Sequence, residues 1–203
     1  MTPPDTRKPR RHGNLREALI DAGIDLLDQG GLPALTLRKC AAKAGVSHAA
    51  PAHHFDGLDG LILAIATRGF TQFTAYMRTH RENAGDTDAA KLRAILDGYI
   101  KFTADHPALF TLMFGARIDI APDPDLSQAA GDAYQTLAET CAPFSTDRDG
   151  NSRSLEILVW SMCHGFASLR LVGQGTPEGP LSDVSFSDVL RRLPDIVGLG
   201  LDD

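Results

Sequence analysis

The chain has 203 residues, of which 43% are apolar and 23% are charged, and its 20 Lys and Arg against 26 Asp and Glu give a net charge of −6. This composition is too apolar for a disordered protein, and the negative total excludes a uniformly basic protein that holds nucleic acid by bulk electrostatics. The longest uninterrupted apolar run, Leu61–Ala66, and the polar, basic first sixteen residues predict neither a membrane span nor a secretory signal.

Apolar residues recur at three- and four-residue spacing along most of the chain, and this pattern predicts helices. The first helix covers residues 14–29 and stops at Gly30-Gly31, and a long second one begins after Asp56. Further helices are expected around Leu92–Ile100, which His106-Pro107 ends, and at residues 107–115, 126–141, 154–172 and 185–199. Alternating strand-like runs are absent, so the predicted fold class is all-α.

Residues 35–55 have the pattern of two short helices joined by a tight turn. Thr36 is suited to cap the first helix, and Gly45 stands where a sharp turn favours a residue that tolerates positive φ. Ser47 is expected to cap the second helix, residues 48–54. Such a pair forms a helix-turn-helix, whose second helix enters the major groove of DNA. A helical hairpin that binds nothing is the alternative.

The segment before this pattern is basic. Its only acid in the first sixteen residues is Asp5, and its basic residues are Arg7, Lys8, Arg10, Arg11 and Arg16. A flexible basic arm beside a helix-turn-helix reaches phosphates or the minor groove, whereas on its own it is a solvated tail. The two features together favour DNA binding.

The order and spacing of these motifs resemble the N-terminal domain of TetR-family transcriptional regulators over about residues 12–65. The residues that carry the resemblance are Gly30-Gly31, Leu35-Thr36-Leu37-Arg38, Ala41, Ala44-Gly45-Val46-Ser47, His54-Phe55 and Leu61. The resemblance implies a homodimer that binds a palindromic operator in double-stranded DNA, and C-terminal helices that dimerise and hold a small-molecule effector. The expected domains are a basic arm (1–13), a three-helix helix-turn-helix domain (14–60) and a helical-bundle domain for effector binding and dimerisation (61–203).

The resemblance and the motif chemistry together give a set of candidate DNA contacts: Arg10, Arg11, Thr36, Arg38, Ser47, His48, Ala49, Ala50, His53 and His54. Ala49-Ala50 suits contact with thymine methyl groups, and the histidines can donate hydrogen bonds to bases or phosphates. The sequence departs from the family where it has Ala52-His53 in place of Tyr-His and Leu58 in place of Lys. Pro51 also lies inside the expected second helix, where it tightens or shifts the first turn. Phosphate contacts therefore fall to the arm and to Arg38, for which a solvated helix face is the alternative.

The C-terminal part is faintly similar to a TetR subgroup with a Trp-His-Gly signature, through Trp160, His164 and Gly165. Packing alone explains these residues, and this simpler interpretation is preferred over a chemical role. The candidate effector pocket is formed by Phe102, Phe110, Met113, Phe114, Tyr134, Trp160 and His164, with plain core packing as the alternative for each. By the same resemblance, residues 154–172 and 185–199 form the dimer surface.

Other classes of function have little support in the sequence. There is no Gly-rich phosphate loop, Gly-x-Ser-x-Gly elbow or His-Glu-x-x-His sequence, so neither an enzyme nor a cofactor is expected. His48, His53 and His54 do not share one helix face, and the three widely spaced cysteines form no Cys-x-x-Cys pair, which predicts a reduced, cytoplasmic protein without a metal site. The prediction is a ligand-responsive transcriptional repressor, and the alternative is a helical partner-binding protein that does not bind DNA.

Overall fold

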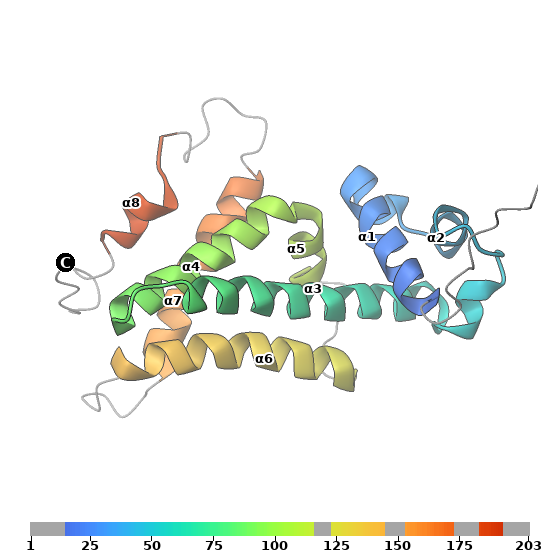
Figure 1. The fold of residues 1–203 in the computed structure, drawn as a ribbon. Helices are drawn as coiled ribbons and strands as arrows, with labels where there is room; N and C mark the ends of the chain where they lie inside the picture. The colour runs from blue at the N-terminus through green and yellow to red at the C-terminus, as the bar shows by residue number, and fades with distance from the viewer. Residues whose placement is uncertain (1–14, 116–122, 145–152, 173–182, 193–203) are drawn as a thin grey trace, which may run out of the picture. The chain divides into compact units, whose positions relative to one another are not determined.

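The computed structural model describes residues 15–115, 123–144, 153–172 and 183–192, and within these ranges every regular element is a helix (Figure 1). The predicted arm with Arg10 and Arg11, and the end of the last predicted helix beyond residue 192, lie outside the described residues. The α-helices are α1 (Leu15–Ala34), α2 (Leu37–Lys43), α3 (Gly57–Glu82), α4 (Asp88–Asp105), α5 (Pro107–Met113), α6 (Pro124–Cys141), α7 (Arg153–Val172) and α8 (Phe186–Leu190), with short 3-10 helices at Ala50–His53 and Ala142–Phe144.

The chain divides into two compact units, and the division falls between Ile65 and Ala66, inside α3. The first unit contains α1, α2 and the start of α3. The second contains the remainder of α3 and all later helices. One continuous helix therefore belongs to both units.

In the first unit, α1 packs against α2. Its helical backbone is interrupted at Gly30 and Gly31, as predicted, and Gly31 has a φ of +63°. A Cβ atom on Gly23 of α1 would lie 2.6 Å from Cδ1 of Ile65, so glycine permits the close approach of α1 and α3. An ion pair of 3.0 Å between Lys43 Nζ and Asp25 also joins α2 to α1.

In the second unit, α4 packs against α5, α6, α7 and α8. The apolar stripes of the two long helices are buried, with Phe70, Phe73 and Met77 on α3 and Leu92, Ile95, Leu96, Tyr99 and Ile100 on α4. A Cβ on Gly98 would lie 2.8 Å from the carbonyl oxygen of Tyr76, so α4 approaches the backbone of α3 closely there. Helix α4 ends at Asp105 with His106 as its C-cap, which confirms the predicted stop.

The later helix starts have side-chain caps. The Asp123 side chain accepts from Leu126 N at 2.8 Å, so α6 begins two residues before the predicted 126–141 segment. Ser185 and Asp188 form a reciprocal capping box at the start of α8, where a helix start was predicted.

Candidate nucleic-acid interface and ligand cavity

The first half of the helix-turn-helix has the predicted local geometry. The Thr36 hydroxyl accepts a hydrogen bond from Lys39 N at 3.2 Å and caps α2, which ends at Lys43 with Ala44 as its C-cap. Gly45 follows with a φ of +70°, a left-handed conformation that costs other residues about 1–2 kcal/mol. Val46 N then donates to the carbonyl of Ala41 at 3.0 Å and closes the turn.

The second half differs from the prediction. Ser47 was expected to cap an α-helix over residues 48–54, but the chain forms a turn followed by the 3-10 helix Ala50–His53, which has no side-chain cap. The Ser47 carbonyl accepts from Ala50 N at 3.0 Å instead. The physical reason is Pro51, because it has no N–H to donate to the Ser47 carbonyl four residues earlier. The predicted Ser47 cap and α-helix are therefore wrong, and the predicted tightening at Pro51 is what occurs.

The candidate DNA contacts that the structure describes lie at the surface of the first unit. Arg38, Ser47, His48, Ala49, His53 and His54 are exposed, and Thr36 and Ala50 are half-buried. Beneath them, Phe55 is 7% exposed and the Arg16 guanidinium lies 5.6 Å from its ring centroid. Pro51 is also buried, so the 3-10 helix is anchored from below while its polar side chains remain accessible. Among the described residues, no group of three His, Cys, Asp or Glu is placed to hold a metal ion.

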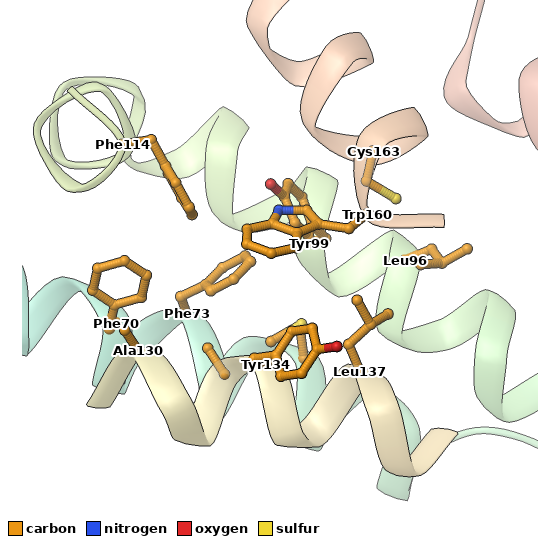
Figure 2. A pocket seen from close by; sticks show the side chains of 12 residues that line it. Phe70, Phe73, Leu96, Tyr99, Phe114, Ala130, Tyr134, Leu137, Trp160 and Cys163 are labelled. Carbon is orange, nitrogen blue, oxygen red and sulfur yellow. The ribbon is translucent and has the colours of Figure 1, made fainter. Parts of the chain in front are cut away.

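The second unit contains an apolar cavity of about 160 Å³ (Figure 2). Its lining residues come from α3, α4, α6, α7 and the end of α5, and they are Phe70, Phe73, Met77, Leu96, Tyr99, Phe114, Ala130, Ala133, Tyr134, Leu137, Trp160 and Cys163. Of the predicted pocket residues, Phe114, Tyr134 and Trp160 line it. Phe102, Phe110 and Met113 are buried in the core and are not among its lining residues.

His164 lines a second hollow of about 380 Å³ together with Phe114, Trp160, Ser161 and Gly165. Phe114 and Trp160 line both spaces, so the hollow adjoins the cavity. Sequence reasoning named His164 and missed its partner Tyr99, although a tyrosine on a buried helix stripe signals that its hydroxyl needs a hydrogen-bond partner.

Tyr99 and His164 connect the cavity with the hollow. The Tyr99 hydroxyl lies 3.0 Å from Nδ1 of His164. Burial raises the pKa of Tyr99 and lowers the pKa of His164, so both groups are neutral near pH 7. The hydroxyl therefore donates to Nδ1, and the remaining imidazole proton is on Nε2.

A second tyrosine of the cavity wall is held by a carboxylate. Tyr134 of α6 donates its hydroxyl proton to Glu156 of α7, which is 8% exposed. This hydrogen bond, together with burial, raises the pKa of Tyr134. The interaction fixes the Tyr134 ring at the junction of two helices that both line the cavity.

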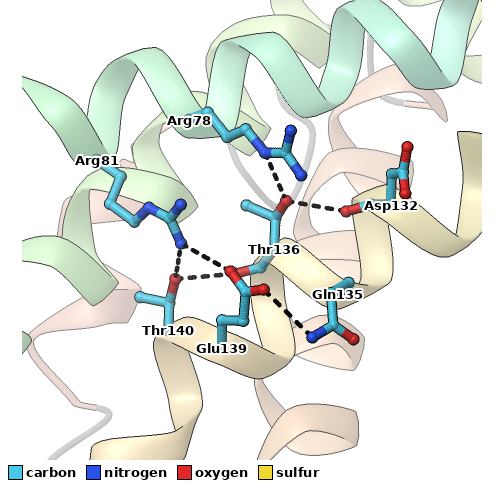
Figure 3. A network of polar contacts seen from close by, with 7 residues as sticks. All are labelled: Arg78, Arg81, Asp132, Gln135, Thr136, Glu139 and Thr140. Carbon is cyan, nitrogen blue, oxygen red and sulfur yellow. Dashed lines mark hydrogen bonds and ion pairs between the residues drawn. The ribbon is translucent and has the colours of Figure 1, made fainter.

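Polar contacts join α6 to α3 (Figure 3). Arg78 Nε donates to the Thr136 hydroxyl and an Arg81 guanidinium nitrogen donates to the Thr140 hydroxyl, both at 3.2 Å. Thr136 and Thr140 are buried, and Arg81 also lies 3.6 Å from the Glu139 carboxylate. Helix α6 therefore forms a wall of the cavity and makes direct hydrogen bonds to α3.

Helix α7 exposes an unusual amount of apolar surface. Four of its large apolar side chains are exposed, to 49% for Ile157, 39% for Leu158, 53% for Leu169 and 85% for Val172. By length and composition alone the helix could cross a membrane, and 28% of its most apolar window is buried in the described structure. Val159, Cys163, Phe166 and Ala167 form its buried side, and α7 packs against α4 and α6.

Comparison with known proteins gives matches in both units. Residues 19–65 match the sequences described as "Bacterial regulatory proteins, tetR family", and residues 92–193, half of the chain, match "Tetracyclin repressor-like, C-terminal domain". A segment of 83 residues is 36% identical to the HTH-type transcriptional regulator BetI of Stenotrophomonas maltophilia, and it covers 41% of this chain and 42% of that protein. The match thus spans less than half the length of this curated relative.

Solved structures share the whole fold. A protein of unknown function from a Rhodococcus species is 26% identical with a TM-score of 0.76, over 94% of this chain and 97% of that one. The fatty acid degradation regulator FadR from Bacillus halodurans is 12% identical with a TM-score of 0.67, over 97% of this chain and 98% of that one.

Proposed function

Because the chain belongs to the TetR family of bacterial regulatory proteins, we propose that it is a cytoplasmic, homodimeric transcriptional repressor that a small apolar effector releases from its operator. The observation that carries this proposal is the capped α2, the Gly45 turn and the segment from Ser47 to His54 with its exposed polar side chains, all within one compact unit. This arrangement leaves polar side chains accessible on an element anchored by buried Pro51 and Phe55.

In this proposal, base contacts come from His48, Ala49, Ala50 and His53 of this segment. Arg38, Thr36, Ser47, His54 and the arm residues Arg10 and Arg11 contact the phosphate backbone. The 3-10 helix is short, so it brings few side chains to the base edges. The arm and Arg38 consequently supply most of the affinity, and that share depends strongly on salt.

Homodimer formation is proposed to use the exposed side of α7. Ile157, Leu158, Leu169 and Val172 lie on a helix whose opposite side is already buried against α4 and α6. Burying this side against its copy removes apolar surface from water, and a two-fold interface presents the same patch twice. The two DNA-binding units must then be about 34–36 Å apart to enter successive major grooves.

Release is proposed to depend on α6. An effector in the cavity displaces α6, which contributes Ala133, Tyr134 and Leu137 to the lining. Because Arg78 and Arg81 attach α3 to Thr136 and Thr140, the displacement passes to α3, which continues into the first unit. Such coupling is reciprocal and typically amounts to about 1–3 kcal/mol, so the operator weakens effector binding by the same factor.

Genome-wide mapping of the sites bound by the protein tests the proposal, followed by footprinting of the recovered fragments. We expect two related half-sites whose centres are about one helical turn apart. A purified dimer that shifts none of these fragments at low salt would refute a DNA-binding role and favour the helical partner-binding alternative. An enzymatic role has no support among the proposed contacts, which contain no paired nucleophile and base.

A further inference from the structure

The volume of the cavity limits the size of what it can hold. Its volume is about 160 Å³. A dry protein cavity of roughly 150 Å³, lined by apolar side chains, binds a single benzene molecule. The cavity lined by Phe73, Tyr99, Tyr134, Trp160 and their neighbours therefore fits one six-membered ring, and further atoms of a ligand must extend beyond it.

The lining also limits the charge of the ligand. Every described lining residue of the cavity has an uncharged side chain, and the two tyrosines keep their protons because their pKa values are raised. An ion transferred from water into such a cavity has no partner for its charge, and the loss of its hydration is unfavourable. The cavity favours a neutral ring, which can pack against the surrounding aromatic side chains.

The imidazole of His164 is a hydrogen-bond donor in the hollow that adjoins the cavity. His164 lines the adjoining hollow, and Phe114 and Trp160 line both the hollow and the cavity. Since Tyr99 occupies Nδ1 at 3.0 Å, the remaining imidazole proton is on Nε2 of His164. A ring in the cavity that carries a carbonyl or ether oxygen directed at the hollow would give the Nε2–H of His164 an acceptor.

We propose that the effector is an uncharged, single-ring aromatic molecule with one hydrogen-bond acceptor beside the ring, and that His164 Nε2–H donates to that acceptor. The inference rests on the proposed function in one respect, because it takes this cavity to be the effector site. It adds the chemical class of the ligand and identifies the residue that determines specificity. The ring supplies the apolar contact, and the single hydrogen bond distinguishes the ligand from hydrocarbons of the same shape.

Four probe compounds separate these elements of the proposal. Acetophenone has the ring and the acceptor, α-methylstyrene replaces its carbonyl oxygen with a methylene group, and benzoate and benzylammonium add a negative or a positive charge. Titration calorimetry with the full-length protein measures each affinity, and quenching of Trp160, the only tryptophan of the chain, reports occupancy at the cavity. We expect acetophenone to bind about three to ten times more tightly than α-methylstyrene, which is the effect of one hydrogen bond. Both ions should bind at least about tenfold more weakly than acetophenone.

Matched variants test the role of His164. Changing His164 to Phe alone would leave the buried Tyr99 hydroxyl without its acceptor, so the variant is the double change Tyr99→Phe with His164→Phe, and Tyr99→Phe alone is its control. Because Tyr99 itself lines the cavity, the measured quantity is the ratio of the two probe affinities within each variant. The double variant should bind the two neutral probes with equal affinity, whereas the control retains the imidazole and should still bind acetophenone more tightly than α-methylstyrene.

Several results would overturn the inference. Equal affinity of the wild-type protein for acetophenone and α-methylstyrene would show that no acceptor is recognised. Tighter binding of either ion than of acetophenone would show that the cavity is not selective for neutral rings. Absence of binding by both neutral probes would exclude single-ring ligands. Binding of the mapped DNA fragments is measured on the same preparation, so a protein that binds DNA without binding the probes refutes this inference alone. A protein that binds acetophenone selectively and shifts no DNA supports the inference about the site and refutes the proposed regulator.

Discussion

Replacing Ala133 with leucine should stabilise the protein and block its cavity in one step. Ala133 lies on α6, is 5% exposed and lines the cavity. The change places three additional carbon atoms into empty space beside Tyr134 and Leu137. A matched control is Ala138→Leu on the same helix, at a half-buried position that is not among the lining residues.

The magnitude follows from the size of the cavity. At about 24 cal/mol per Å³, an empty volume of about 160 Å³ destabilises the fold by up to about 4 kcal/mol. Three buried carbon atoms return about 2.4 kcal/mol at about 0.8 kcal/mol each, and the ordering of the leucine side chain removes about 0.5–1 kcal/mol of this gain. The expected net stabilisation is about 1.5–2 kcal/mol, which corresponds to a rise in Tm of about 3–8 °C for a chain of this length.

Urea denaturation at one fixed protein concentration, for wild type and both variants, measures the free energy of unfolding. Acetophenone titration and a shift assay on mapped DNA are run on the same samples. We expect Ala133→Leu to gain stability, lose probe binding and keep DNA binding, while Ala138→Leu changes stability by less than about 0.5 kcal/mol. A loss of stability in Ala133→Leu would mean that the cavity cannot accept an isobutyl group, and would refute this account of its shape.

Replacing Arg10 and Arg11 with alanine should weaken binding to all DNA sequences alike and reduce the salt slope by about one per lost phosphate contact; an unchanged slope in salt-dependent titrations would mean that the arm does not contact DNA. Replacing His48 should instead change which operator is preferred and weaken binding to the native site by about 1–3 kcal/mol, whereas an equal loss on every sequence in a binding-site selection would contradict base contact. Thr36→Ala removes the cap of α2 and should destabilise the protein by about 1 kcal/mol in urea denaturation, while Thr36→Ser restores most of that loss. Arg78→Met breaks a direct α3–α6 hydrogen bond, so acetophenone should bind with unchanged affinity but weaken operator binding less than in wild type; undiminished coupling in a paired titration would exclude this connection.

The helices and their buried faces are properties that local sequence determines. Stripes such as Leu61, Ile65 and Phe73 on α3 recur at helical spacing, and burial of an apolar face stabilises a helix wherever the rest of the chain provides a partner surface. Local chemistry also determined the cap at Thr36 and the positive φ at Gly45, since each depends on only a few neighbouring residues. The same local reasoning failed at Ser47, where Pro51 outweighed a favourable capping residue.

The ligand cavity could not be predicted from local sequence patterns. Phe102 and Phe110 have the same residue type and helical spacing as Phe73 and Phe114, yet the first two are absent from the cavity lining and the second two form part of it. Likewise, no spacing rule pairs Tyr99 with His164, which are 65 positions apart. An amphipathic sequence specifies that a face is buried, but whether the buried side chains meet or leave a space depends on how several helices pack around one point. Sequence therefore determined the family, the helices and the exposed candidate contacts to DNA, while tertiary packing decided the cavity and the Tyr99–His164 contact beside it.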